Sequence, residues 1–124
     1  MKSYVIDAST VGVGSPLMNE ADALFAPELI DLEVANLLRK AVLRLDRSAD
    51  EAGSMLVAWA SNEIVRFPHA PYLDTIWRLR NNISAYDAAY VALTMHLGST
   101  LLTADHRLAV AASRYCDVIA VRGP

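Results

Sequence analysis

The sequence predicts an α/β fold with a mainly parallel sheet, and three observations support that prediction. Short apolar runs rich in β-branched residues alternate with segments whose apolar residues recur every three or four positions. Capping signals precede several of the helical segments. Acidic residues close two of the predicted strands, at the edge where sheets of this kind bind ligands. No repeat, linker or low-complexity segment interrupts the 124 residues, so we expect one domain over residues 1–124.

Five short runs are predicted to form the strands of the sheet. Each is four to seven residues long, is rich in apolar residues and is bounded by turn-forming or polar residues. The predicted strands cover residues 3–7, 23–26, 63–68, 99–105 and 118–121. Residues 9–16 contain two glycines and a proline and are predicted to be a loop.

The segments between the strands are predicted to be helical. Ser48 and Ser84 each begin a capping box, with an acid three residues later, and Gly98 ends the second of these two helices. Pro27 and Glu28 suit the first turn of the longest helix. The predicted helices cover residues 28–45, 48–61, 71–80, 84–98 and 106–115, with a brief helical turn at 17–22.

Composition excludes several classes of protein. A net charge of −3 argues against a strongly basic duplex-DNA binder, although it leaves RNA open. Cys116 is the only cysteine, which excludes an intramolecular disulfide and a multi-cysteine zinc site. Hydrophobic residues make up 54% of the chain and mean hydropathy is +0.26, so we expect a second subunit to cover some apolar surface.

The chain also lacks the expected signals for export or membrane insertion. The apolar run after Lys2 is too short for the hydrophobic region of a signal peptide. The longest apolar stretch, residues 88–104, is broken by polar residues and a glycine and is predicted to be a helix, a turn and a strand. We therefore expect a cytoplasmic protein with no membrane partner.

Four carboxylates fall where a charge is costly unless something binds it: Asp7, Glu33, Asp87 and Asp105. Asp7 and Asp105 close predicted strands, and Glu33 and Asp87 lie near the starts of apolar helices. If the two strands are neighbours, their carboxylates face one crevice. A divalent cation is the partner that four carboxylates suit best, so the pattern points to metal-dependent phosphodiester chemistry.

Each of the four acids also has a local alternative. Asp87 completes a capping box, although this does not explain why the rest of its helix is apolar all round. Glu33 flanks the apolar stripe of its helix but is also a candidate for a solvated first-turn acid. Asp7 suits a turn, and Asp105 suits the N-cap of the helix that follows it. The case for a shared site is stronger for the four acids together than for any one alone, because the α/β topology can bring them to one edge of the sheet.

Three further residues are candidates for supporting roles. Ser9 and Thr103 lie two residues from Asp7 and Asp105, where a hydroxyl could orient a carboxylate, a water or a phosphate; ordinary strand-end hydrogen bonding is the alternative. Arg80 lies near the start of the Asp87 helix and is the candidate for contact with a phosphate.

Four segments of the chain together match the pattern of a known family: residues 5–9, 27–34, 82–93 and 101–108. They resemble segments of the PIN-domain ribonucleases, and specifically of the VapC toxins of bacterial type II toxin–antitoxin systems. The matching segments occur in the expected order through nearly the whole chain, and the third is the most specific. The resemblance implies a single PIN-like domain with a parallel, mainly five-stranded sheet flanked by helices, and with the four acids at one edge.

The resemblance also implies a function. It implies an endoribonuclease that uses Mg²⁺ or Mn²⁺, with Asp7 and Asp87 as the main ligands and Glu33 and Asp105 completing the cluster. It implies an RNA substrate, a cognate antitoxin protein and a homodimer. One departure is that Glu33 follows Asp7 by only 26 positions, so the first helix and its loop must be short.

Two other functions remain open from the residues. The first is a catalytically inactive binding module of the same fold that acts through a partner protein. The second is a phosphotransfer enzyme of the haloacid dehalogenase type with Asp7 as nucleophile. Such enzymes need a second Asp two residues later, and Ser9 occupies that position.

Overall fold

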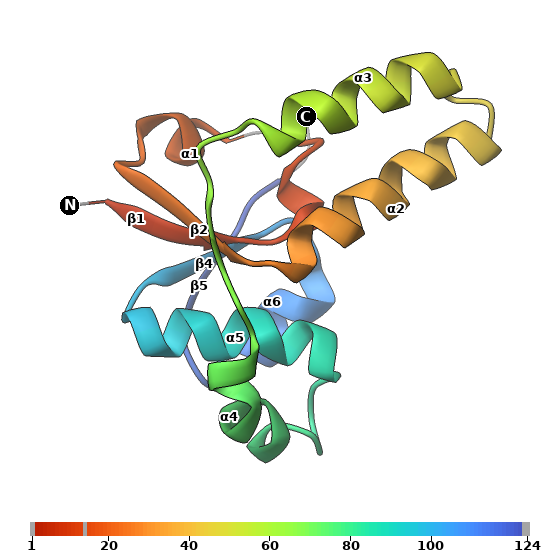
Figure 1. The fold of residues 1–124 in the computed structure, drawn as a ribbon. Helices are drawn as coiled ribbons and strands as arrows, with labels where there is room; N and C mark the ends of the chain where they lie inside the picture. The colour runs from red at the N-terminus through yellow and green to blue at the C-terminus, as the bar shows by residue number, and fades with distance from the viewer. Residues whose placement is uncertain (1, 14, 123–124) are drawn as a thin grey trace.

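A computed structural model gives the fold of the chain and describes residues 2–13 and 15–122 (Figure 1). Its sheet has five strands in the order β3-β2-β1-β4-β5, and every neighbouring pair is parallel. The strands are β1 (Ser3–Ile6), β2 (Ala23–Pro27), β3 (Val65–Phe67), β4 (Thr100–Thr103) and β5 (Asp117–Ala120). The α/β fold with a five-stranded parallel sheet is therefore confirmed.

Helices connect the strands and cover the sheet. The α-helices are α1 (Pro16–Glu20), α2 (Leu29–Leu43), α3 (Ala49–Ala60), α4 (Leu73–Arg78), α5 (Ala85–Leu97) and α6 (His106–Ala112). Two short 3₁₀ turns, η1 (Ala8–Thr10) and η2 (Ala70–Tyr72), precede α1 and α4. No helix in the described part of the chain is both long and apolar enough to span a bilayer.

The order of the strands creates a crevice between β1 and β4. The chain moves from β1 to β2 and β3 on one side, and then returns to place β4 and β5 on the other side. Tyr4, Val5 and Ile6 pair with Thr100, Leu101 and Leu102. Helices that connect parallel strands diverge at such a reversal, which leaves a cleft at the carboxyl ends of the two strands.

The core lies between the sheet and α5. Helix α5 packs across β1, β2 and β4, and α4 packs on the outside of α5 (Figure 1). Residues 88–94 of α5 are all buried, as are Val5, Ile6, Leu101 and Leu102 of the central strands. An apolar helix on the two central strands fixes where the first turn of α5 meets the carboxyl ends of those strands.

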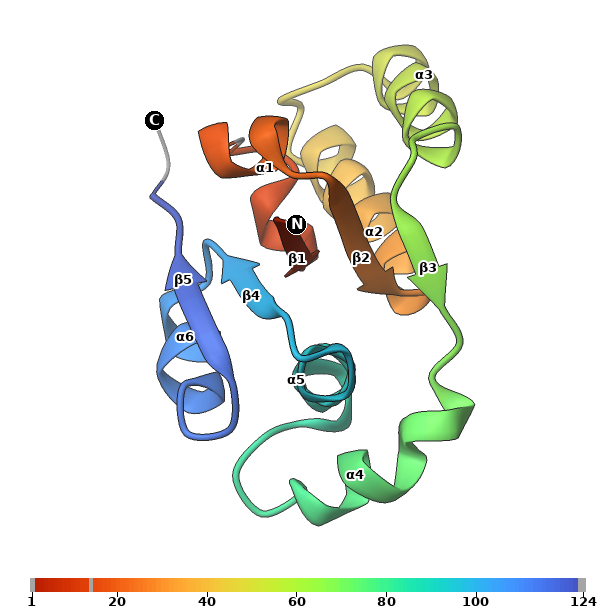
Figure 2. The same cartoon turned by 90° about the vertical axis from the view of Figure 1, so that its left-hand side faces the viewer.

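Helices α2 and α3 form a hairpin that projects beyond the sheet (Figures 1 and 2). Only the beginning of α2 packs on the sheet layer, against β2 and η1, and the rest packs on α3. The turn between the two helices is exposed, with Leu45 at 90% exposure and in a left-handed conformation, φ +62°. The first turns of α2 thus face the sheet edge, while its last turns face solvent.

Most differences from the predicted elements occur at their ends. The predicted loop at 9–16 overlaps the end of η1 and the first residue of α1, and in η1 the Thr10 amide and hydroxyl both donate to the carbonyl of Asp7. The predicted helix at 71–80 divides into η2 and α4. The last helix stops at Ala112 and not at Tyr115. Gly14, within the predicted loop, lies outside the described residues.

Candidate active site

The four predicted acids line one cavity at the carboxyl ends of β1 and β4. The cavity has a volume of about 240 Å³ and opens to solvent. Its walls come from the turn after β1, from one face of α2, from α5 and from the second residue after β4. The lining residues are Asp7, Ala8, Ser9, Glu33, Asn36, Leu37, Lys40, Asp87, Tyr90 and Asp105.

Asp7 is the most buried acid of the cavity and is held at both oxygens. Its side chain is 5% exposed. Ser9 Oγ donates to Asp7 Oδ1 at 2.6 Å, and Thr103 Oγ1 donates to Asp7 Oδ2 at 2.7 Å. The two hydroxyl oxygens lie 3.2 Å apart. Two charge-assisted hydrogen bonds, one from the η1 turn and one from the end of β4, therefore fix the orientation of this carboxylate.

Ser9 and Thr103 are themselves anchored by the chain after β4. Ser9 Oγ accepts a hydrogen bond from the Ala104 amide at 2.8 Å, and Thr103 Oγ1 accepts one from the Asp105 amide at 3.0 Å. Each hydroxyl thus has its acceptor role filled by the backbone, so its hydrogen is free to point at Asp7. This arrangement couples the ends of β1 and β4 around one carboxylate.

Glu33 reaches the cavity from α2 and is held by Tyr90 of α5. The Tyr90 hydroxyl donates a hydrogen bond to Glu33 Oε1. Tyr90 is 1% exposed, so its ring is fixed by packing and its hydroxyl by this contact. Asp31, two residues earlier on α2, faces elsewhere: it accepts hydrogen bonds from Trp59 and Arg66 at 2.7–2.9 Å.

Asp87 and Asp105 lie at the starts of α5 and α6. The Asp87 amide donates to Ser84 Oγ at 3.2 Å, so Ser84 provides the N-cap of α5. Asp105 is itself the N-cap of α6, with Oδ1 accepting from the amides of Arg107 and Leu108 at 3.0 and 3.2 Å. The alternative that Asp105 caps the helix after it is therefore correct, and the same residue also lines the cavity.

Asp7, Glu33 and Asp87 have raised pKa values, chiefly because they are buried and in part because nearby carboxylates repel their charges. Burial raises the pKa of Asp7 most, and the charges of Asp105 and Asp87 raise it further, against the hydrogen bonds from Ser9 and Thr103. Burial is also the largest cause of the raised pKa of Glu33. The charges of Asp7 and Asp87 raise this pKa further, and the hydrogen bond from Tyr90 lowers it. The pKa of Asp87 is raised by burial and then by Asp105, while Arg107 lowers it. The cavity therefore holds negative charge that the protein alone does not neutralise.

The four carboxylates of the cavity are the kind of ligand that suits a hard divalent cation, although their oxygens do not converge on one point in the structure. Carboxylate oxygens are the donors that Mg²⁺ and Mn²⁺ prefer, and a cation would reverse the upward pKa shifts. Among residues 2–13 and 15–122, no group of three or more His, Cys, Asp or Glu forms a ready-made metal site. Binding one ion by three or more of these acids would require side chains at the rim to turn inward.

Arg80, predicted from its sequence position to contact phosphate, does not reach the cavity. It is absent from the lining residues. Its guanidinium lies 4.7 Å from the centre of the Trp77 ring, and its Nη1 donates to the Trp77 carbonyl at 2.9 Å. The prediction used nearness to the α5 helix along the chain. The cation–π contact with Trp77, three residues earlier, holds the side chain at the end of α4 instead.

Three lining residues were missed by the sequence reasoning. Tyr90 lies three residues after Asp87 and so shares its face of α5, and a phenol in a fully buried helix needs a hydrogen-bond partner. Asn36 and Lys40 lie three and seven residues after Glu33 and share its face of α2. Helical spacing from the two predicted acids would have found all three.

Comparison with known sequences finds close relatives over most of the chain. Residues 15–113 match the family described as PIN domain. Ribonuclease VapC1 of Mycobacterium tuberculosis is 44% identical over 98 residues, which cover 78% of this chain and 74% of that protein. VapC ribonuclease Mb0985 of Mycobacterium bovis is 37% identical over 101 residues, covering 82% and 80%. The family match begins after Asp7 and Ser9 and includes the other three acids.

Comparison with solved structures supports the same fold. The crystal structure of PAE2754 from Pyrobaculum aerophilum superimposes with a TM-score of 0.67 at 22% sequence identity, covering 94% of this chain and 83% of that one. At this level of identity the likeness concerns the fold alone.

Proposed function

The chain belongs to the PIN-domain family, among the VapC ribonucleases, and on this basis we propose that it is a metal-dependent endoribonuclease and the toxin of a toxin–antitoxin pair. Its substrate would be RNA, cleaved by hydrolysis of phosphodiester bonds in the cytoplasm. The observation that carries the proposal is the shared cavity of Asp7, Glu33, Asp87 and Asp105 at the β1–β4 crevice.

The four acids support a site for Mg²⁺ or Mn²⁺. Asp7 and Asp87 would be the main ligands, with Glu33 and Asp105 completing the set directly or through waters. When bound, the cation would lower the pKa of a water and stabilise negative charge on the attacked phosphate.

The protein's own contribution is to hold the acids in place and to oppose, through hydrogen bonds, the rise that burial causes in their pKa values. Ser9 and Thr103 donate to both oxygens of Asp7, which favours its carboxylate form and fixes its direction. Tyr90 does the same for one oxygen of Glu33 and leaves the other for the cavity. Asp105 uses Oδ1 to cap α6, so its Oδ2 is the oxygen that remains for a ligand.

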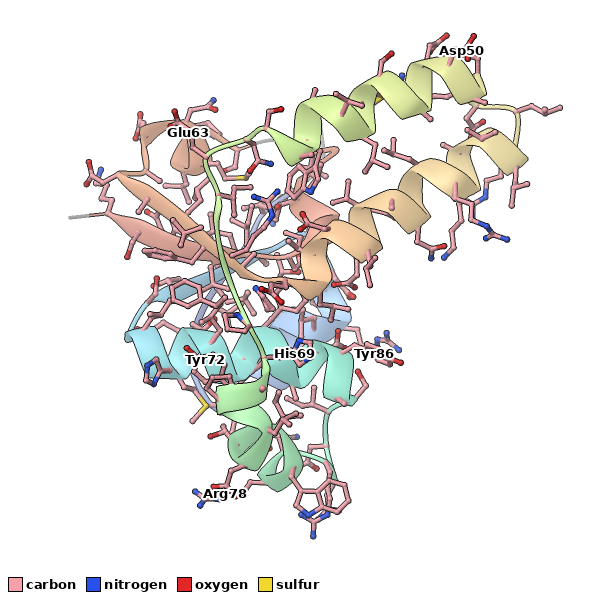
Figure 3. The ribbon with its side chains drawn as sticks, viewed as in Figure 1. Asp50, Glu63, His69, Tyr72, Arg78 and Tyr86 are labelled. Carbon is pink, nitrogen blue, oxygen red and sulfur yellow. The ribbon has the colours of Figure 1, made fainter. Side chains whose placement is uncertain are left out.

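A cognate antitoxin and a second copy of this chain are the proposed protein partners. An apolar groove between α4 and α5 supports the second copy: it is lined by Leu29, Leu73, Ile76 and Tyr86, of which Leu73 is 54% and Tyr86 67% exposed (Figure 3). Contiguous exposed apolar surface of this kind is typical of interfaces. A molar mass measured by light scattering tests the dimer, and a monomer at micromolar concentration would contradict it.

A cleavage assay with purified chain and a mixed pool of single-stranded RNA tests the activity. We expect cleavage with Mg²⁺ or Mn²⁺, no cleavage after chelation, and a loss of roughly 100-fold or more in Asp7→Asn, because several kcal/mol of metal-assisted stabilisation would be removed. Asp50→Asn is the matched control, since Asp50 lies at the far end of α3 (Figure 3). Full activity of Asp7→Asn would refute the site.

The same experiment separates the enzyme from the inactive binding module of this fold. A pure binding module would cleave no RNA with any divalent cation, and metal binding would be indifferent to Asp7. The phosphotransfer alternative is opposed by Ser9, which stands two residues after Asp7 and bonds to it.

A further inference from the structure

A second cavity lies beside the acids, on α6. It has a volume of about 450 Å³ and is lined by Asn82, His106, Arg107, Val110, Ala111 and Arg114. We call it the α6 pocket. Its described lining residues include two arginines, a histidine and an amide, and none of them is an acid. It is therefore a positive site in a chain whose net charge is −3.

The α6 pocket adjoins the acidic cavity through consecutive residues. Asp105 lines the acidic cavity, and the next two residues, His106 and Arg107, line the α6 pocket. The pKa of Asp87 is raised by burial and by Asp105, and the charge of Arg107 opposes that rise, so Arg107 lies close enough to act on this acid. A polyanion with one phosphate at the acids would thus meet Arg107 at the boundary between the two cavities.

Within residues 2–13 and 15–122, the arginines of the α6 pocket form no salt bridge with an acid. The salt bridges of these residues involve Arg47, Arg66 and Arg78. Arg107 and Arg114 are both exposed. Guanidinium groups that are not engaged by a carboxylate bind phosphate through several hydrogen bonds in one plane, which suits a phosphodiester.

The remaining lining residues suit a nucleobase better than a bare anion. Val110, 56% exposed, and Ala111 supply apolar surface on α6. Asn82 Nδ2 donates to Tyr115 Oη at 2.9 Å, which holds the amide in one orientation at the pocket wall. Unstacked bases of single-stranded RNA are recognised by apolar or guanidinium surface together with fixed hydrogen-bonding groups.

We propose that the α6 pocket binds a nucleotide of single-stranded RNA adjacent to the phosphodiester bond that is cleaved. Arg107 and Arg114 contact its phosphates, and Val110, Ala111 and Asn82 contact its base. The inference rests on the proposed ribonuclease function and assigns a substrate-binding role to residues next to the acidic cavity, which Arg80 does not line. An acidic peptide is the competing ligand, and it is disfavoured because it makes no use of the apolar and amide surface.

RNA binding measured without cleavage tests the pocket. The parent is Asp7→Asn, and the variants add Arg107→Gln and Arg114→Gln, singly and together, with melting temperature as the check on folding. Fluorescence anisotropy with a labelled single-stranded RNA gives Kd between about 50 and 200 mM salt. We expect the double variant to bind about tenfold or more weakly, because two charge-assisted hydrogen-bonding groups are removed. The slope of log K against log salt should become shallower by roughly 0.7 for each phosphate that the variant no longer neutralises.

Arg78→Gln is the matched control for charge. Arg78 forms an ion pair with Asp74 at 2.7 Å on α4 and points away from the rest of the molecule (Figure 3), so its loss should change neither Kd nor the slope. Equal affinity and slope in the double variant and the parent would overturn the proposal. So would weakened binding of an acidic peptide with unchanged binding of RNA.

The base contact has its own test. In an NMR titration of the full chain, a nucleoside monophosphate should shift the Asn82 side-chain and Ala111 backbone amides, whereas inorganic phosphate should leave Ala111 in place. Identical shifts with both ligands would reduce the site to a phosphate site and refute the nucleotide assignment. Failure of the proposed ribonuclease function can be told apart from failure of the α6 pocket. A chain that cleaves no RNA can still be tested for RNA binding. A parent that binds no RNA would refute both.

Discussion

Asp7 is the residue on which the acidic cavity is organised. It takes hydrogen bonds from two hydroxyls that belong to different ends of the chain, and it is the least exposed of the four acids. Burial nevertheless dominates its pKa, which remains raised. The ionised acids therefore destabilise the native state, chiefly because they are buried and in part because they repel one another, and a bound cation would offset both effects.

The Asp87→Asn substitution isolates this repulsion. Its backbone amide, which bonds to Ser84, is unchanged, so α5 keeps its cap. Removing the charge relieves Asp7 and Glu33, both of which Asp87 affects. We expect the variant to melt at a temperature equal to or above that of the wild type in a chelating buffer at neutral pH, and to lose cleavage activity.

The pH dependence follows from the direction of the pKa shifts. Asp7, Glu33 and Asp87 have raised pKa values, so the native state binds more protons than the unfolded state once pH exceeds the unfolded values. Their contribution to stability is complete below the unfolded values and is lost as pH rises through the folded ones. Thermal melts in chelator from about pH 4 to pH 7 should therefore show a smaller loss in Asp87→Asn than in the wild type. A large fall in its melting temperature at every pH would instead mean that Asp87 stabilises α5.

At the scale of elements, α5 and α3 each begin with a serine N-cap, but α5 lies against the sheet and α3 does not. Ser84 accepts from the amide of Asp87 at 3.2 Å, and Ser48 accepts from the amide of Glu51 at 3.1 Å. Helix α5 is buried against the sheet and carries Asp87 and Tyr90, whereas α3 lies on the projecting hairpin. The two caps therefore form a matched pair for separating stability from activity.

Ser84→Ala and Ser48→Ala should each reduce the free energy of unfolding by about 1 kcal/mol, because each leaves one helix amide without its acceptor. Only Ser84→Ala should also lower the rate of RNA cleavage, since the first turn of α5 sets the position of Asp87. Urea unfolding measures the first quantity and the cleavage assay measures the second. An equal loss of activity in both variants would show that activity follows overall stability and not the position of α5.

The elements were predictable from the sequence for identifiable reasons. Apolar periodicity and the two capping boxes located α2, α3 and α5, and Gly98, with φ +59°, ends α5 where predicted. The division of residues 70–78 into η2 and α4 was not predictable. The apolar spacing in this segment fits a single short helix as well as it fits a 3₁₀ turn followed by a helix. Helix α6 stops three residues early, at Ala112.

The acids of the site and their neighbours on the same helix face were predictable from the sequence, whereas the contacts between different elements were not. Strand ends and helix starts are visible in sequence, so Asp7 and Asp105 could be placed at one edge once the sheet was parallel. The contact between Tyr90 and Glu33 joins residues 57 positions apart, and the direction of Arg80 depends on a local contact with Trp77. Such contacts depend on how elements pack, which spacing along the chain does not report.

For the whole molecule, metal binding should appear as stabilisation. A ligand that binds only the native state raises stability by RT ln(1 + [L]/Kd), about 2.7 kcal/mol at a concentration of 100 Kd. We expect the melting temperature of the wild type to rise with Mn²⁺ and to fall again on chelation, and that of Asp7→Asn to change little. Calcium-free buffer and a constant ionic strength keep general salt effects out of the comparison. An equal rise in both proteins would mean that the ion binds elsewhere.

The bond between Thr103 and Asp7 joins residues 96 positions apart, and this has a consequence during synthesis. A ribosome has to make most of the chain before β4 can pair with β1 and before Thr103 and Asp105 can join the other acids. The acidic cavity is therefore incomplete until the segment that carries Thr103 and Asp105 has emerged, and a shorter nascent chain holds at most three of its four acids.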